Sequence, residues 1–421
     1  MNAKKFTAVF FLGIIIFMMC LAPVSLAVKQ IRKIYEPEDT SENKIDWEKL
    51  YPFDGPHIRT DYESTKKETL YTYIKRKCDE YTSKYLLGYE SLIAAARKYE
   101  DAINWNIVNV LGYNSVVKLH DGYLTTFTES RDITRTADSV IEFASWCMKR
   151  GIEFFYASYP NKVCTYEDRN ISGKLDFSNQ NVNRFLARLD EVGVKNYDFH
   201  KLLHDDGMKH HESFYRTDHH WKAETGLWAS RHILQILRDD YGWPVDPEIL
   251  NPDRFEYVNY PEWFLGSEGK KLTLSRTTPD DFTMIYPKFS SSLHIEIPDI
   301  PLDTIGDFTA TYDMEKVKEK DYYNLSPYGA YDHGRRPVVR IENLKAYNSK
   351  KLLLVYTSFS DCVIPFLALN IKYVEAVDLR QFDGSLKNYI IRSKPDAVVV
   401  DYTATMPGAE TGYDKTLYIF Q

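Results

Sequence analysis

The chain has 421 residues, a formal net charge of −7, 44% hydrophobic residues and 27% charged residues. This is the balance of an ordinary globular protein that is long enough for one large domain or two. No long basic run follows the first residues, so the sequence lacks the concentrated Lys/Arg surface that nucleic-acid binding requires. We therefore expect no nucleic-acid partner.

The N-terminus predicts export from the cytoplasm. Lys4 and Lys5 precede an apolar run over residues 6–28. The run is long enough to span a bilayer as one helix, and residues 25–27 include the small side chains that a signal peptidase requires. We expect residues 1–28 to be a signal peptide or a membrane anchor. In either case the rest of the chain crosses the membrane, to be secreted or to stay anchored at its outer side.

Residues 29–109 are predicted to form a linker and one long amphipathic helix. The first part, to about residue 56, is polar and rich in proline. From residue 60 to about 104, apolar side chains recur at every third or fourth position, a spacing typical of an amphipathic helix. We expect this helix to pack on the domain or on a partner.

The cysteines after the N-terminal run are scattered, at positions 78, 147, 164 and 362. Their spacing includes no C-x-x-C pair, so it indicates neither a zinc ribbon nor a redox motif. We expect buried thiols that behave as small apolar residues. A disulfide bond between Cys147 and Cys164 remains an open alternative.

Residues 110–421 show an alternation of strand and helix patterns. A strand, a tight turn and a return strand are expected at 116–124, and residues 244 to about 340 are expected to form an irregular insertion. The alternation predicts an α/β domain with a doubly wound, mainly parallel sheet that is flanked by helices. Strands are predicted at 153–157, 194–197, 351–356, 374–377 and 397–400, and helices at 135–150, 179–192, 221–241 and 386–392.

The densest group of proton-transfer side chains lies in the stretch Asp218-His219-His220-Trp221. Asp218 and His220 are two residues apart, so in an extended segment their side chains would leave the same face. A carboxylate there can hold the imidazole at Nδ1–H and leave Nε2 free as a base. The helix predicted to start at Trp221 would turn the positive end of its dipole toward Asp218. The alternative is a pair of surface histidines before a helix.

A candidate nucleophile follows the apolar strand at 351–356. In doubly wound sheets, reactive groups collect at the carboxyl ends of the strands, and the segment Thr357-Ser358-Phe359-Ser360 comes directly after this one. Ser358 is the best candidate, because backbone N–H groups of the following turn can face a developing oxyanion. Ser360 is the second candidate. An ordinary helix cap would give the same pattern.

A metal cluster is a competing interpretation of the histidine-rich region. Its ligands would come from His210, His211, Glu212 and residues 218–220. However, no pair has the i, i+4 spacing of a metalloprotease helix, and adjacent histidines would point to opposite sides of a strand. We expect no metal and no cofactor.

Together these motifs resemble the DHHW protein family, which is related to the alginate O-acetyltransferase branch of the SGNH hydrolases. The resemblance rests on residues 218–221 and 351–380, and it extends to 121–124, 160–162 and 264–270. It implies an SGNH-like fold with a catalytic triad. In this triad Asp218 orients the imidazole, His220 acts as the base and Ser358 is the nucleophile. The resemblance assigns supporting roles to His219, Gly266 and Ser360.

Besides Asn370-Ile371, where relatives carry His-Tyr, two segments near the catalytic groups depart from the family pattern. Relatives usually carry Gly-Asp-Ser or Lys-Asp-Ser at the nucleophile, where this chain has Tyr356-Thr357-Ser358. A Thr-Ser pair does occur in the alginate-type transferases. Relatives also have a Gly-Asn pair that can supply oxyanion donors, whereas residues 328–332 of this chain contain no asparagine.

The resemblance implies an exported transferase that moves O-acyl groups, chiefly acetyl, onto an extracellular polysaccharide through an acyl-serine intermediate. Its implied partner is a membrane-bound O-acyltransferase that passes the acyl group across the membrane. A polysaccharide acetylesterase with the same triad is one alternative. A catalytically idle glycan-binding or scaffold protein of the cell envelope is the other, and the two departures favour it.

Overall fold

The structure is a computed structural model that describes residues 91, 107–108, 116–119, 122–167, 176–272, 274, 276–409, 414 and 416–421. The predicted signal or anchor segment lies outside these residues, as does the long amphipathic helix apart from the helical Ser91. In the described part of the chain, no helix is both long and apolar enough to cross a membrane. The chain divides into a first unit, Met1–Asn114, with the short strand β1 (Ile107–Val108), and a second unit, Ser115–Gln421.

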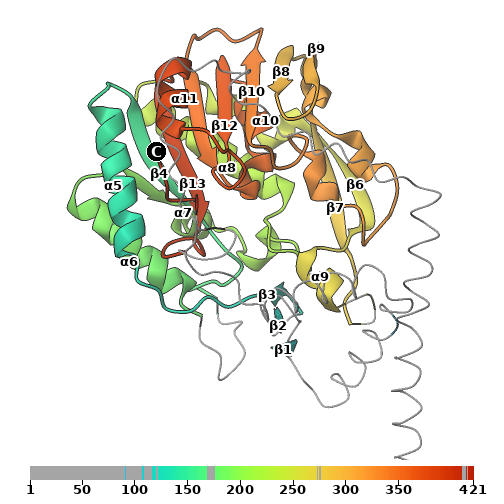
Figure 1. Ribbon diagram of the computed structural model, residues 1–421. Coiled ribbons are helices and arrows are strands. Elements are labelled where there is room, and N and C mark those ends of the chain that lie inside the picture. The colour runs from blue at the N-terminus through green and yellow to red at the C-terminus, as the bar shows by residue number, and fades with distance from the viewer. Residues whose placement is uncertain are drawn as a thin grey trace, which may run out of the picture. The chain divides into compact units, whose positions relative to one another are not determined.

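One eight-stranded sheet forms the centre of the second unit (Figure 1). The first five strands of the order given below run parallel to one another, and the last three are antiparallel to their neighbours. The domain is therefore α/β with a mostly parallel sheet, as the alternation predicted. The order across the sheet is β5 (Asn196–Asp198), β4 (Glu153–Tyr159), β13 (Ala397–Thr403), β11 (Lys351–Tyr356), β12 (Tyr373–Val377), β10 (Val338–Asn343), β8 (Leu293–Ile297) and β9 (Leu302–Gly306).

The central strands β11 and β13 are buried on both faces, because helices cover both sides of the sheet. Burial on both faces explains the apolar runs at 352–356 and 397–400. Alternate residues of β4 face different layers: Tyr159 packs edge-on against Phe199 of α7, and Tyr156 packs against Phe185 of α6. The helices are α5 (Thr134–Met148), α6 (Ser178–Glu191), α7 (Phe199–Asp205), α8 (Ala223–Asp239), α9 (Ser267–Leu272), α10 (Ile364–Leu367) and α11 (Leu386–Ser393).

The region 244–340 is more regular than its sequence indicated. Two of its strands, β6 (Phe255–Phe264) and β7 (Asp280–Pro287), pair as an antiparallel ribbon. The next two, β8 and β9, join the edge of the main sheet through β10. These strands are short or half-exposed, as in β8, where buried and partly exposed residues alternate. Such strands give a weaker sequence signal than a strand that is buried on both faces.

The short elements complete the description. The predicted strand–turn–strand is present as β2 (Val116–Lys118) and β3 (Leu124–Thr125), which pair antiparallel. The 3-10 turns are η1 (His211–Ser213), η2 (Pro247–Leu250), η3 (Pro252–Arg254), η4 (Phe308–Thr311), η5 (Met314–Val317), η6 (Pro327–Ala330) and η7 (Ser358–Cys362). Cys147, Cys164 and Cys362 are free thiols, so the disulfide alternative is not formed.

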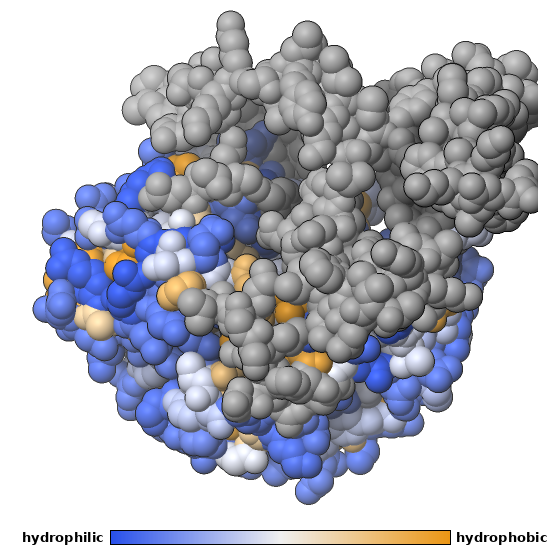
Figure 2. Space-filling view, turned by 90° about the horizontal axis from the view of Figure 1, so that it is seen from below, coloured by the Kyte–Doolittle hydropathy of each residue, from blue (hydrophilic) through white to orange (hydrophobic). Residues whose placement is uncertain are grey.

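The described surface seen in Figure 2 is mainly hydrophilic, with hydrophobic side chains scattered over it. Among the described residues, the large hydrophobic side chains with the highest exposure are Tyr347, in a bend between β10 and β11, and Ile305, in β9. Singly exposed apolar residues of this kind are normal on a folded domain.

Candidate active site

The Asp-His-His-Trp stretch lies in a loop that an isolated β-bridge between Phe214 and Trp221 closes at its base. Residues 216–220 form successive bends and not an extended strand. The rings of His219 and His220 consequently lie together, with centroids 3.8 Å apart. The expectation that adjacent histidines point to opposite sides is therefore wrong, because only a pleated strand imposes that alternation.

The loop brings together Asp218, His220 and Ser358, the three residues assigned catalytic roles from the sequence. His220 Nδ1 lies 2.5 Å from Asp218 Oδ1, and His220 Nε2 lies 2.7 Å from Ser358 Oγ. When Nδ1–H donates to the carboxylate, Nε2 presents its lone pair to the hydroxyl, which is the tautomer that a general base requires. We call this hydrogen-bonded chain of three side chains the relay.

Asp218 is held from behind by the start of α9. The carboxylate is buried, and its Oδ2 accepts a hydrogen bond of 2.6 Å from the backbone N–H of Ser267. Gly266 allows this approach, because a β-carbon at that position would lie 2.2 Å from Asp218 Cβ. The helical N–H that reaches Asp218 therefore comes from α9, whereas α8, the helix expected to face it, begins only at Ala223.

Electrostatics keep the relay ready to accept a proton. Burial and, after it, the neighbouring His219 lower the pKa of His220 to about 4, although the Asp218 carboxylate acts in the opposite direction. Burial opposes ionisation of Asp218, but the two histidines and the Ser267 N–H outweigh it and hold its pKa well below the usual value. At neutral pH the relay therefore contains a carboxylate and a neutral imidazole.

Two aromatic rings fix the plane of the His220 imidazole. Tyr328 stacks on it with ring centroids 4.1 Å apart and an interplanar angle of 18°, and Phe359 lies at 5.2 Å. The Tyr328 hydroxyl donates to the Phe359 carbonyl oxygen at 3.2 Å. In the sequence, residues 328–332 stand out only because they lack an asparagine, and nothing there predicts a role for the Tyr328 ring.

Asp280, at the start of β7, anchors the loop and was also missed. Its Oδ1 accepts from the Arg216 backbone N–H at 2.9 Å. Its Oδ2 accepts from the Thr217 N–H at 2.8 Å and from the Thr217 hydroxyl at 2.6 Å. The buried Lys162 ammonium donates to the backbone carbonyls of Leu124 and Arg216. Such contacts join distant segments, so local spacing carries no signal for them.

The other supporting residues occupy different places. Ser360, the second candidate nucleophile, is fully buried, and its hydroxyl lies 3.4 Å from the Tyr159 hydroxyl and not at His220. His219 is about half exposed, and its Nδ1 lies 3.1 Å from Ser267 Oγ. The structure thus places His219 beside the relay and Ser360 in the core.

The nucleophile candidate lies at the carboxyl edge of the parallel strands. Ser358 begins η7 directly after β11. Next to β11, Asp378 follows β12 and Asp401 lies within β13; both are fully buried. The Arg380 guanidinium binds both Asp378 oxygens at 2.9 Å, and its charge also lowers the pKa of His220. This edge is where doubly wound sheets carry their sites.

Metal ligation would compete with the relay. Ligand atoms of Asp218, His219 and His220 lie within 4.8 Å of one another, so these three side chains could hold an ion. Both ring nitrogens of His220 are already engaged, however, by Asp218 and by Ser358. The wider cluster considered from the sequence is not assembled here, because His211 instead contacts the Glu167 carboxylate at 2.9 Å.

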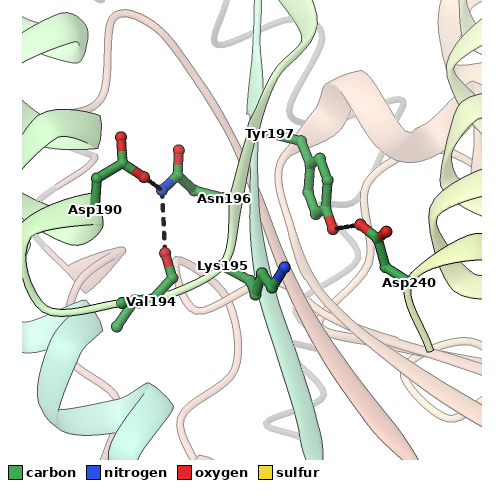
Figure 3. Close-up of a pocket in the computed structure, with 7 residues that line it drawn as sticks. Asp190, Val194, Lys195, Asn196, Tyr197 and Asp240 are labelled. Carbon is green, nitrogen blue, oxygen red and sulfur yellow. Dashed lines mark hydrogen bonds between the residues drawn. The ribbon is translucent and has the colours of Figure 1, made fainter.

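A pocket on the described part of the domain lies away from the relay (Figure 3). It includes residues 193–195, just before β5, where Asn196 Nδ2 donates to Asp190 Oδ1 at 2.7 Å and the Tyr197 hydroxyl bonds to Asp240. This is the amino end of the strand, opposite the carboxyl edge that carries Ser358. None of its lining residues belongs to the relay.

Comparisons with known proteins support the fold. Residues 119–247 match the family model of an SGNH hydrolase-like domain of the acetyltransferase AlgX, and no curated protein matches the chain. The structure of Bacillus cereus PatB1 with a sulfonyl adduct is similar at a TM-score of 0.60 and 17% identity, over 73% of this chain and 98% of that one. A DHHW family protein from Eubacterium siraeum is similar at a TM-score of 0.55 and 18% identity, over 74% and 96%.

At these identities the two solved structures show a shared fold and no more. The family match includes the loop that carries Asp218 and His220. Residues 119–247 are therefore similar to the SGNH hydrolase-like domain of the acetyltransferase AlgX, which confirms the resemblance that the motifs indicated.

Proposed function

We propose that this chain is an exported O-acetyltransferase that modifies hydroxyl groups of an extracellular polysaccharide through an acyl-Ser358 intermediate. The observation that carries the proposal is the relay itself, in which one imidazole joins a buried carboxylate at 2.5 Å to a serine hydroxyl at 2.7 Å. A helix cap or a surface histidine pair would need no such alignment of three side chains from two distant segments.

In the acylation step, Ser358 Oγ attacks the carbonyl carbon of the acyl donor while its proton passes to His220 Nε2. The negative charge of Asp218 stabilises the imidazolium. The N–H groups of Ser358 and Phe359 precede the first hydrogen bond of η7, from the Ser360 N–H to Thr357, and we assign them to the oxyanion. Collapse of the tetrahedral intermediate expels the donor's oxygen, which takes the proton from His220.

In the transfer step, His220 removes the proton of a sugar hydroxyl, and the sugar oxygen attacks the acyl-serine. The ester bond to Ser358 breaks, the hydroxyl of Ser358 regains a proton from His220, and the acetylated sugar leaves. The acyl donor would be a membrane-bound O-acyltransferase, because acetyl-CoA is not found outside the cell. Water as acceptor would make the same residues an acetylesterase.

A covalent probe tests the nucleophile. Since PatB1, which shares the fold, was solved with a sulfonyl adduct, we expect a sulfonyl fluoride to add one sulfonyl group to the full-length chain, measurable as a mass increase on Ser358. Ser358→Ala should abolish the adduct, and His220→Ala should slow its formation by about 10³-fold or more. Ser360→Ala is the matched control and should be labelled like the wild type.

Hydrolysis and transfer are separated by their products. The full-length chain is supplied with an activated acetyl ester, with and without a deacetylated oligosaccharide. Acetylated oligosaccharide supports a transferase, whereas acetate alone in both reactions supports the esterase alternative. A chain that binds glycan but leaves Ser358 unlabelled by the sulfonyl fluoride would contradict both and indicate an idle binding protein.

A further inference from the structure

A second group of ligand-type side chains lies outside the relay, near the carboxyl ends of β4 and β5. Cys164 follows β4, His200 lies in the first turn of α7, and His210 comes just before η1. Their sulfur and ring-nitrogen ligand atoms all lie within 4.8 Å of one another. His200 Nε2 is 3.4 Å from Cys164 Sγ, and the two imidazole centroids are 4.8 Å apart.

His210 is held in the tautomer that a metal ligand needs. Its Nε2 lies 2.7 Å from the Asn161 carbonyl oxygen, which can only accept, so Nε2 carries the hydrogen. Nδ1 is therefore the unprotonated nitrogen. It is buried in a side chain that is only 3% exposed, and it has no hydrogen-bond partner. Metal-bound histidines characteristically donate their other ring N–H to a backbone carbonyl in this way, and an unpartnered buried nitrogen is otherwise costly.

The surroundings hold His200 in place. The Asp198 carboxylate caps α7 by accepting from the His200 backbone N–H at 2.9 Å. Tyr166 lies edge-on to His200 at 5.2 Å between ring centroids and partly covers the group.

We propose that Cys164, His200 and His210 form a binding site for a thiophilic transition-metal ion, with Zn²⁺ as the expected occupant and water as its fourth ligand. One soft sulfur and two imidazole nitrogens are a donor set that zinc accepts in tetrahedral geometry. Bonds of about 2.0–2.3 Å at tetrahedral angles place ligand atoms roughly 3.3–3.7 Å apart. The ligand atoms lie within 4.8 Å of one another, so small side-chain movements would bring them to this distance. Binding converts the Cys164 thiol to a thiolate and releases its proton to solvent.

Cobalt substitution gives a test whose signal depends on sulfur. We expect the reduced, full-length chain to bind one Co²⁺ or Zn²⁺ at this site, with a thiolate-to-cobalt charge-transfer absorption that zinc displaces. Cys164→Ser should remove this absorption, and His210→Ala should weaken zinc binding by about 100-fold or more. Cys147→Ser and His232→Ala, which change another free thiol and another imidazole, are the matched controls and should bind like the wild type.

The relay residues are the main competing site, since Asp218, His219 and His220 can also approach one ion. They offer no sulfur, so cobalt bound there would lack the charge-transfer absorption, and that binding would be lost in His219→Ala. The melting temperature of each variant is also measured without metal. A variant that melts like the metal-free wild type is folded, so its weaker metal binding reflects the loss of a ligand. Zinc should raise the melting temperature of the wild type but not of Cys164→Ser. Absence of the absorption in the wild type, or its persistence in Cys164→Ser, would overturn the proposal.

Discussion

Gly266 lies directly against Asp218. A β-carbon at position 266 would come within 2.2 Å of Asp218 Cβ and 2.5 Å of the Thr217 carbonyl oxygen. Both of these neighbours are fixed, because the Gly266 N–H donates to the Thr217 hydroxyl at 2.9 Å and the Ser267 N–H donates to Asp218 at 2.6 Å. Glycine at this position therefore allows α9 to supply a backbone donor to the relay carboxylate.

The first prediction is that Gly266→Ala pushes α9 away from Asp218. We expect a loss of about 1–3 kcal/mol in unfolding free energy from overpacking, and a labelling rate at Ser358 at least about tenfold lower, because Asp218 loses a hydrogen bond. Denaturant unfolding and the rate of sulfonylation measure the two effects. Gly329→Ala is the control, since a β-carbon there would meet only one atom, at 3.9 Å. Equal effects of both substitutions would contradict this account of Gly266.

The second prediction concerns pH. The neutral form of His220 is the active base, and its pKa is lowered to about 4 by burial and by His219. A lowered pKa moves proton uptake to lower pH. The kcat/KM for an activated acetyl ester should therefore stay constant as the pH falls through 6.5, and it should drop to half its value only near pH 4. His219→Ala removes the neighbouring imidazole that lowers the pKa of His220, and should move this midpoint to higher pH. His294→Ala, on strand β8, is the control. A wild-type midpoint at 6.5, or an unshifted one in His219→Ala, would refute this reading.

The sequence was most informative where one local pattern determines the structure. The continuous apolar run at 352–356, which follows Lys351, marks β11, because a strand buried on both faces is apolar where it is buried. The catalytic candidates could be predicted for a similar reason, since Asp218 and His220 are only two residues apart and Ser358 comes just after a buried strand. Each of these two segments can be recognised from its own residues, even though His220 and Ser358 lie 138 positions apart.

The sequence was least informative where a role depends on a distant partner. Asp280 opens β7 and anchors residues 63 and 64 positions earlier, a pairing that no spacing rule connects. Tyr328 reads as an ordinary core aromatic until its ring is seen on His220. The bends at 216–220 were likewise misread as extended, because the β-bridge that forms the loop lies outside them.

The third prediction is that Asp280→Asn loosens the catalytic loop. The carboxylate accepts three hydrogen bonds from Arg216 and Thr217, and an amide can accept only through its oxygen. We expect a loss of about 1.5–3 kcal/mol in unfolding free energy, typical of hydrogen bonds to a charged group, and a lower kcat at a nearly unchanged pH midpoint. Asp281→Asn, at the exposed neighbour, should leave kcat unchanged. If Asp280→Asn shifted the pH midpoint but not kcat, Asp280 would act on charge and not on position.

The last prediction separates the ring of Tyr328 from its hydroxyl. The ring stacks on His220 at 4.1 Å between centroids, whereas the hydroxyl donates to the Phe359 carbonyl oxygen. Tyr328→Phe keeps the stacking and should lose about 1 kcal/mol of stability with kcat within a few-fold of wild type. Tyr328→Leu removes the ring and should lower kcat by about tenfold, since an aromatic pair contributes roughly 0.5–1.5 kcal/mol and its loss frees the imidazole to rotate. Turnover of an activated acetyl ester, compared with unfolding free energy, distinguishes the two. A kcat loss as large in Tyr328→Phe as in Tyr328→Leu would assign the effect to the hydroxyl.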